Sequence, residues 1–211
     1  MRPFALSAAL LLGLAAPAEA SILTFSWTGT VTQVDAPLAS GATIGDPGSG
    51  SFQIESTTPD SAASADFGDY PGPQNMTITL GDITATSALG TIGGLSVFDF
   101  TFDGIELDTG PWSGAPIGSF ALQFAALNME DADATTFSSD AIPTSLTLAD
   151  FEIRLFRIGF RDGEAFAQVQ GVVESITITV PEPSSRALLV SGALALLMRR
   201  ARGLGSRQGR A

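Results

Sequence analysis

Carboxylates are the main side chains of this sequence that could bind a metal ion or transfer a proton. The 211-residue chain has 22 acidic residues and neither histidine nor cysteine. The lack of histidine removes the commonest general base and metal ligand, and with them Ser-His-Asp catalysis. The lack of cysteine excludes disulfides, Cys-His catalysis, and zinc or iron–sulfur sites held by thiolates.

The densest acidic group lies in a predicted loop over residues 128–140. It comprises Glu130, Asp131, Asp133 and Asp140. Calcium takes oxygen ligands from loops of this kind. The segment lacks the spaced acidic pattern of an EF-hand loop, however, and runs of charge are usually solvated. We therefore expect a solvated loop and assign no metal ligand or cofactor-binding residue, with calcium as the alternative.

A second acidic group surrounds a predicted hairpin and comprises Asp99, Asp103, Glu106 and Asp108. Glycoside hydrolysis uses two carboxyl groups about 5 to 10 Å apart. Strand alternation turns Asp99 away from the neighbouring phenylalanines, toward solvent, and the turn Asp103-Gly104 accounts for Asp103. Because nothing marks a pair with perturbed pKa values, we expect no catalytic residue and no enzymatic activity.

The large aromatic residues and the arginines of the body offer few alternatives. Trp27 lies on the apolar face of the first predicted strand, where we expect it in the core. Tyr70 and Trp112 fall in Pro- and Gly-rich loops, where they could stack on a sugar ring or anchor the loop. Arg154 and Arg157 lie on opposite faces of one predicted strand and form no common patch. No phosphate-binding loop or dinucleotide fingerprint is present.

Charge is divided unequally along the chain. Residues 21–180 contain 20 acidic residues and three arginines, a net charge of -17, whereas residues 184–211 contain six arginines and no acid. The acidic body should be repelled by nucleic acid and by anionic lipid. The basic tail favours the inner, anionic face of a membrane. We expect no nucleic-acid partner.

The body is predicted to consist of about ten short strands. Apolar and polar residues alternate cleanly from Ser21 to Val34, and hairpin turns are expected at Gly81-Asp82, Asp103-Gly104 and 161–163. Residues 56–75 are predicted to form a long loop, and a bulge near Gly171 explains a change of apolar phase. The remaining strands are expected at 51–55, 76–80, 83–86, 98–102, 105–107, 119–124, 146–148, 152–160 and 164–180, with a short helix as the alternative over 121–130.

Short strands at regular spacing with turns between them are typical of an antiparallel β-sandwich or jelly-roll-like fold. The sequence therefore predicts an all-β domain over residues 21–180. Residues 1–20 read as a secretory signal peptide. They combine a positive start, an apolar run over 4–16 and a small-x-small cleavage site formed by Ala18 and Ala20.

The C-terminal segment 181–211 has three parts. The motif Pro181-Glu182-Pro183 is followed by the apolar run 187–198 and then by Arg199, Arg200 and Arg202. Twelve helical residues reach about 18 Å, against a hydrocarbon core of about 30 Å. The run therefore predicts a short transmembrane helix, and the arginines would act as a cytoplasmic membrane stop. An ordinary single-pass anchor is the alternative.

This arrangement of motif, short apolar helix and arginines resembles the PEP-CTERM sorting signal of Gram-negative bacteria. The resemblance covers residues 180–202. It implies an exosortase, a membrane transpeptidase, as partner, an inner-membrane-anchored precursor, and a final place at the cell surface or in the extracellular biofilm matrix. We therefore expect an exported, non-enzymatic surface or matrix protein. The alternative is a calcium-assisted, lectin-like module that binds exopolysaccharide.

Overall fold

The computed structural model describes residues 20–89 and 92–180. The sorting motif, the predicted transmembrane helix, the arginine stop and nearly all of the predicted signal peptide lie outside this part. Ten strands and two short 3-10 helices form the described part, which confirms the all-β class. The elements are β1 (Ile22–Val34), η1 (Ala36–Leu38), β2 (Pro47–Glu55), β3 (Phe67–Pro71), β4 (Gln74–Leu80), β5 (Ile83–Leu89), β6 (Ile92–Asp99), β7 (Asp103–Gly110), β8 (Ala121–Asp131), η2 (Leu148–Asp150), β9 (Ile153–Asp162) and β10 (Ala165–Thr179).

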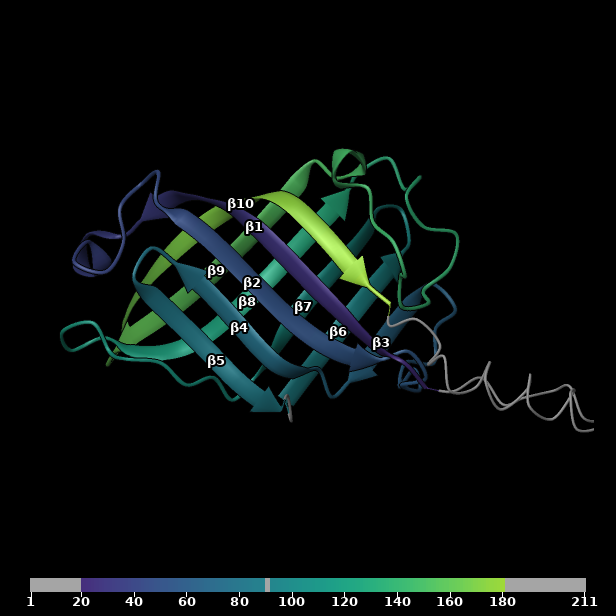
Figure 1. Ribbon diagram of the computed structural model, residues 1–211, viewed down its shortest axis with the longest axis horizontal. Helices are drawn as coiled ribbons and strands as arrows, with labels where there is room; N and C mark the ends of the chain where they lie inside the picture. Colours follow the sequence, from purple (N-terminus) through teal and green to yellow (C-terminus); the bar gives the residue numbers. More distant parts are fainter. Residues whose placement is uncertain (1–19, 90–91, 181–211) are drawn as a thin grey trace, which may run out of the picture. The chain divides into compact units, whose positions relative to one another are not determined.

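All ten strands belong to one antiparallel sheet in the order β3-β6-β7-β8-β9-β10-β1-β2-β4-β5. The sheet curls, so that β4 and β9, which are four places apart in this order, lie close to each other (Figure 1). A Cβ added to Gly171 would lie 2.8 Å from Leu80 of β4 and 2.9 Å from Phe156 of β9. The all-β prediction is thus confirmed, whereas the two separate sheets of a sandwich are not.

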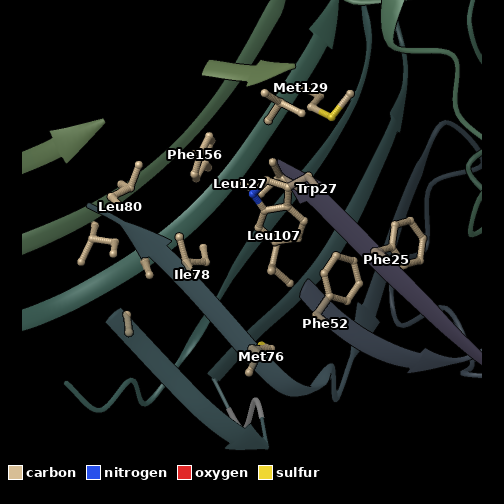
Figure 2. Packing of buried hydrophobic residues seen from close by; sticks show 14 of the residues in the cluster. Phe25, Trp27, Phe52, Met76, Ile78, Leu80, Leu107, Leu127, Met129 and Phe156 are labelled. Atoms are coloured by element: carbon tan, nitrogen blue, oxygen red, sulfur yellow. The ribbon is translucent and has the colours of Figure 1, made fainter. Parts of the chain in front are cut away.

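The inner, concave face of the sheet carries the hydrophobic core. On β1 the predicted apolar face is confirmed, because Leu23, Phe25, Trp27 and Val31 are all buried. Phe25 stacks on Phe52 of β2 with ring centroids 4.5 Å apart. The Trp27 ring meets the edge of Phe156 at 6.4 Å, two strands away (Figure 2). Residues from both halves of the curled sheet therefore share one core.

The three predicted hairpins are present, but two of them have a different turn. The turn Gly81-Asp82 is confirmed, with Gly81 at a φ of +59°. The second hairpin pairs Asp99 with Asp103, so its turn is 100–102 rather than Asp103-Gly104. The third pairs Asp162 with Ala165, which moves the turn from 161–163 to 163–164.

Three further predictions are corrected in position. The predicted loop 56–75 contains strand β3, which pairs with β6 at the edge of the sheet. The predicted strand at 146–148 is replaced by the 3-10 helix η2. The bulge in the last strand lies at Glu174 rather than near Gly171, because Thr28 pairs with Ser175 and Gly29 pairs with Val173. For residues 121–130, the strand is confirmed over the helical alternative.

Candidate functional site

Acidic side chains occupy one end of the inner face, where β6, β7 and β8 lie side by side. Asp99 pairs with Asp103, and Asp103 pairs in turn with Asp131. Asp103 follows the inward alternation of Ile105 on β7, and both Asp103 and Asp131 are buried. Directly opposed residues on one face have Cβ atoms about 4.5–5.5 Å apart. The register thus brings two buried carboxylates together.

Asp131 organises the loop that follows β8. Its Oδ1 accepts the backbone N–H of Asp133 at 3.0 Å, and its Oδ2 accepts the N–H groups of Thr135 at 2.9 Å and Thr136 at 3.1 Å. The hydroxyls of the same two threonines also donate to Oδ2. The bond from the Thr135 backbone is the largest of the influences that lower the pKa of Asp131, and the other donors add to it. The buried carboxylate is therefore held in its charged form.

This lowered pKa predicts an acid-sensitive loop. The Asp131 pKa in the folded state lies below the unfolded value of about 3.9, so its contribution to stability is present above about pH 4 and is lost as the pH falls through the folded-state value. Asp131→Asn should therefore lower the melting temperature at pH 7, and the difference from the wild type should shrink below pH 4. Thermal melts from pH 7 to pH 2 measure this, with Asp82→Asn in an exposed turn as the control. A difference that does not change with pH would contradict the assignment.

Asp131 shares its surroundings with two exposed carboxylates. Carboxylate oxygens of Asp131, Asp133 and Glu152 all lie within 4.8 Å of one another. Glu152 directly precedes β9, where its N–H donates to the Glu130 carbonyl, and its Oε2 accepts the N–H of Ala132 at 2.9 Å. Three acidic groups from two segments therefore surround one point.

Only part of the predicted acidic group contributes to this cluster. Asp131 and Asp133 belong to it, whereas Glu130 instead accepts a hydrogen bond from Asn128 at 3.0 Å. Asp140 lies in the loop over β3, where its carbonyl accepts the Tyr70 hydroxyl. Glu152 was not predicted, because it is 19 residues from Asp133 and only the pairing of β8 with β9 brings it near.

Asp103 has a different role from the predicted turn residue. It is fully buried in β7, where its Oδ2 accepts the N–H of Phe137 at 2.6 Å. Its Oδ1 is buried and has no hydrogen-bond partner. Because Phe137 directly follows Thr136, the carboxylates of Asp103 and Asp131 both bind the backbone of the same loop. An unsatisfied buried carboxylate oxygen is costly and calls for an explanation.

The four carboxylates around the second hairpin do not form one site. Asp103 faces inward, and Asp99 follows the same alternation rather than facing solvent as predicted. Glu106 takes the opposite face. Burial, followed by the nearby charge of Asp108, raises the pKa of Glu106, and Arg157 partly offsets this effect. The prediction of Asp99 was wrong because Val97, not Phe98, continues the core face.

The two predicted sugar-stacking aromatics are not free platforms. Tyr70 lies on β3 rather than in a loop, is buried, and donates its hydroxyl to the Asp140 carbonyl at 2.9 Å. Burial is the main cause that raises the pKa of Tyr70, with smaller contributions from Asp60 and Asp140. Trp112 is half-buried against the core. The core position predicted for Trp27 is confirmed.

The outer face of β10, β1, β2, β4 and β5 carries two continuous rows of hydroxyl side chains, here called the hydroxyl rows. Each row takes one serine or threonine from every one of the five strands, and neither contains a charged residue. At about 4.8 Å between strands, a row spans about 19 Å. The rows are Thr177, Ser26, Ser51, Thr77 and Thr86, and Ser175, Thr28, Ser49, Thr79 and Thr84.

Comparison with known proteins leaves the assignment of function to this geometry. No protein-family model, curated protein or solved structure matches the chain. Within residues 20–89 and 92–180, the structure contains no helix that is both long enough and apolar enough to cross a membrane.

Proposed function

We propose that this is an exported, non-enzymatic protein of the cell surface or extracellular matrix, sorted by its C-terminal segment. The observation that carries the proposal is the position of Pro181-Glu182-Pro183 in the chain. Strand β10 ends at Thr179, and the compact unit that contains the core also ends there. The motif therefore begins just beyond the last core strand. Cleavage at or after it would remove no core residue.

The sequence at both ends supports the same route. The signal peptide over residues 1–20 would direct the acidic body out of the cytoplasm. The apolar run 187–198 would hold the precursor in the inner membrane, with Arg199 and its neighbours on the cytoplasmic side. An exosortase-type transpeptidase would then act between the body and the membrane.

Deletion of the sorting motif should abolish processing. In a host that contains an exosortase, a chain that lacks Pro181, Glu182 and Pro183 should accumulate as an uncleaved precursor, because the recognition sequence is missing. Immunoblots of membrane and extracellular fractions measure the two forms. Deletion of Gly203-Leu204-Gly205, three residues beyond the arginines, is the matched control and should be processed normally. Equal processing of the two deletion variants would refute the proposal.

A second candidate function is binding of a neutral polysaccharide by the hydroxyl rows. Ten uncharged donor and acceptor groups cover this face, whereas the body as a whole has a net charge of -17. A neutral sugar chain offers hydroxyls along its length, so it can exchange hydrogen bonds with successive strands without meeting a like charge. This surface replaces Tyr70 and Trp112 as the place where a lectin-like function would reside.

Removal of hydroxyls from the rows should weaken retention on the host's exopolysaccharide. Replacement of Thr28, Thr79 and Thr84 by valine keeps the strand preference and most of the volume. If each lost hydrogen bond contributes about 0.5 kcal/mol or more, the triple variant should bind at least about tenfold more weakly. The same three-fold replacement at exposed Thr32, Thr57 and Thr147 controls for surface hydrophobicity. Equal retention of both variants in a column assay would exclude this surface.

A further inference from the structure

We propose that a calcium ion binds at the acidic end of the inner face, held by Asp131, Asp133 and Glu152. The proposal goes beyond the sorting function and does not depend on it. It rests on two separate observations. The first is the geometry of the three carboxylates, and the second is the buried and unsatisfied carboxylate of Asp103 beside them.

The spacing of the three carboxylates fits a single hard cation. Calcium binds oxygen ligands at 2.3–2.6 Å, so two ligands on opposite sides of the ion are about 4.6–5.2 Å apart. The oxygens of Asp131, Asp133 and Glu152 all lie within 4.8 Å of one another. Three like charges at this distance repel one another, and a divalent ion at their centre would turn that repulsion into attraction.

The carboxylates are also fixed in place and accessible. Asp131 is anchored by the loop that it organises, and a single N–H, that of Asp133, donates to its Oδ1. Glu152 is held through Oε2 by the N–H of Ala132, which leaves Oε1 for a ligand. Asp133 and Glu152 are exposed, so an ion can enter from solvent without opening the core. Water would supply the remaining ligands, as calcium sites commonly allow.

Asp103 provides the independent sign of a missing positive charge. Its side chain is fully buried, and its Oδ1 has no hydrogen-bond partner. It pairs directly with Asp131 on the inner face, and its Oδ2 binds the N–H of Phe137 in the same loop. The unsatisfied carboxylate therefore lies next to the proposed site. A buried charge without a partner is strongly unfavourable, and a cation beside it would remove that cost.

The nearest basic residue on this face does not supply that charge. Arg154 pairs with Met129, one inward position along β9 from Glu152, and its Nε is buried without a hydrogen bond. The chain has no lysine, and only three arginines lie between residues 21 and 180. The acidic end of the inner face is therefore short of positive charge that comes from the protein itself.

The test is calcium titration of the purified full-length chain in detergent, after removal of metal by a chelator. Isothermal titration calorimetry should show one calcium ion per chain, with a dissociation constant between about 0.1 and 1 mM, as is usual for extracellular sites. At 10 mM calcium the ratio of folded to unfolded protein should then rise about 10- to 100-fold. For a domain of this size, the melting temperature should increase by about 3–10 °C. Magnesium, which keeps its own water shell, should bind at least tenfold more weakly.

The decisive variant is Asp133→Asn combined with Glu152→Gln. Both side chains are exposed, so the double variant should fold, and it should bind calcium at least tenfold more weakly. Its matched control is Asp82→Asn combined with Glu164→Gln, which removes the same two charges at exposed hairpin turns and should bind as the wild type does. Equal loss of affinity in both variants would show diffuse attraction to an acidic body and would overturn the proposal. An absence of saturable heat with the wild type would also overturn it.

Asp103→Asn separates a calcium-linked role from a purely structural one. The neutral amide keeps an acceptor for the N–H of Phe137 and removes the unpaired charge. The calcium-free variant should therefore melt at a higher temperature than the calcium-free wild type, and its rise in melting temperature with calcium should be smaller. A shift of the baseline with an unchanged response to calcium would exclude Asp103 from the site, and the second observation would then fail.

Discussion

Phe52→Ala should lower the free energy of unfolding by about 3–5 kcal/mol, because it removes a fully buried aromatic ring from the centre of the core. Phe52 stacks on Phe25 and lies 6.3 Å from the ring of Trp27, so the cavity would open between two strands that share their largest side chains (Figure 2). Neighbouring backbone is held in the sheet on both sides and cannot collapse into the space. Urea unfolding followed by tryptophan fluorescence measures the loss.

The matched control for this prediction is Phe166→Ala. The same ring is removed there from the outer face of β10, where the side chain is 47% exposed and stacks only on Phe124. We expect a loss of about 1 kcal/mol or less, since little apolar area leaves the protein interior. A similar loss for the two variants would mean that the inner face is not the main core.

Gly29→Ala should be similarly damaging for the opposite reason, because there is no room for an added methyl group. A Cβ at this position would lie 1.8 Å from the carbonyl oxygen of Val172 on β10. The obstacle is backbone in the neighbouring strand, next to the bulge at Glu174, so relief requires the two strands to separate. We expect a loss of about 3 kcal/mol or more, which is a large share of the 5–15 kcal/mol typical of a domain.

Gly159→Ala shows why the kind of obstacle decides the size of the effect. Its Cβ would lie 2.1 Å from the Phe124 ring, which is also too close. Phe124 is a side chain on the outer face and can rotate into solvent, so the loss should be only about 1–2 kcal/mol. Thermal melts of the two variants test the ranking. Equal losses would contradict the argument that the backbone contact at Gly29 cannot be relieved.

The candidate cation site shows how far local sequence patterns reach. Asp131 and Asp133 are neighbours in the sequence, and the loop that contains them was predicted as an acidic group. Glu152 joins them only because β8 and β9 pair in a particular register, which depends on which face each strand buries. No pattern within a short window could have selected Glu152 over Glu130 or Asp140.

Asp103 shows how a strong local signal can be overridden. The dipeptide Asp103-Gly104 favours a two-residue turn, and taken alone it predicts an exposed aspartate. The core instead aligns Val97 with Ile105, and that register makes Asp103 a buried strand residue with Phe100 in the turn. Burial of the apolar pairs outweighs the preference of one turn type, because hairpin turns differ by less free energy than buried aliphatic side chains contribute.

Alternation of apolar and polar residues was sufficient to predict the all-β class, the apolar face of β1 and the hairpin at Gly81, because side-chain direction in a strand repeats every two residues. Composition likewise showed an acidic body without histidine or cysteine, and the sequence at the two ends led to the sorting proposal. Only the tertiary structure decided that one sheet curls on itself and that buried carboxylates meet beneath one loop. These features depend on pairing between distant segments, and pairing is decided by how the whole inner face packs.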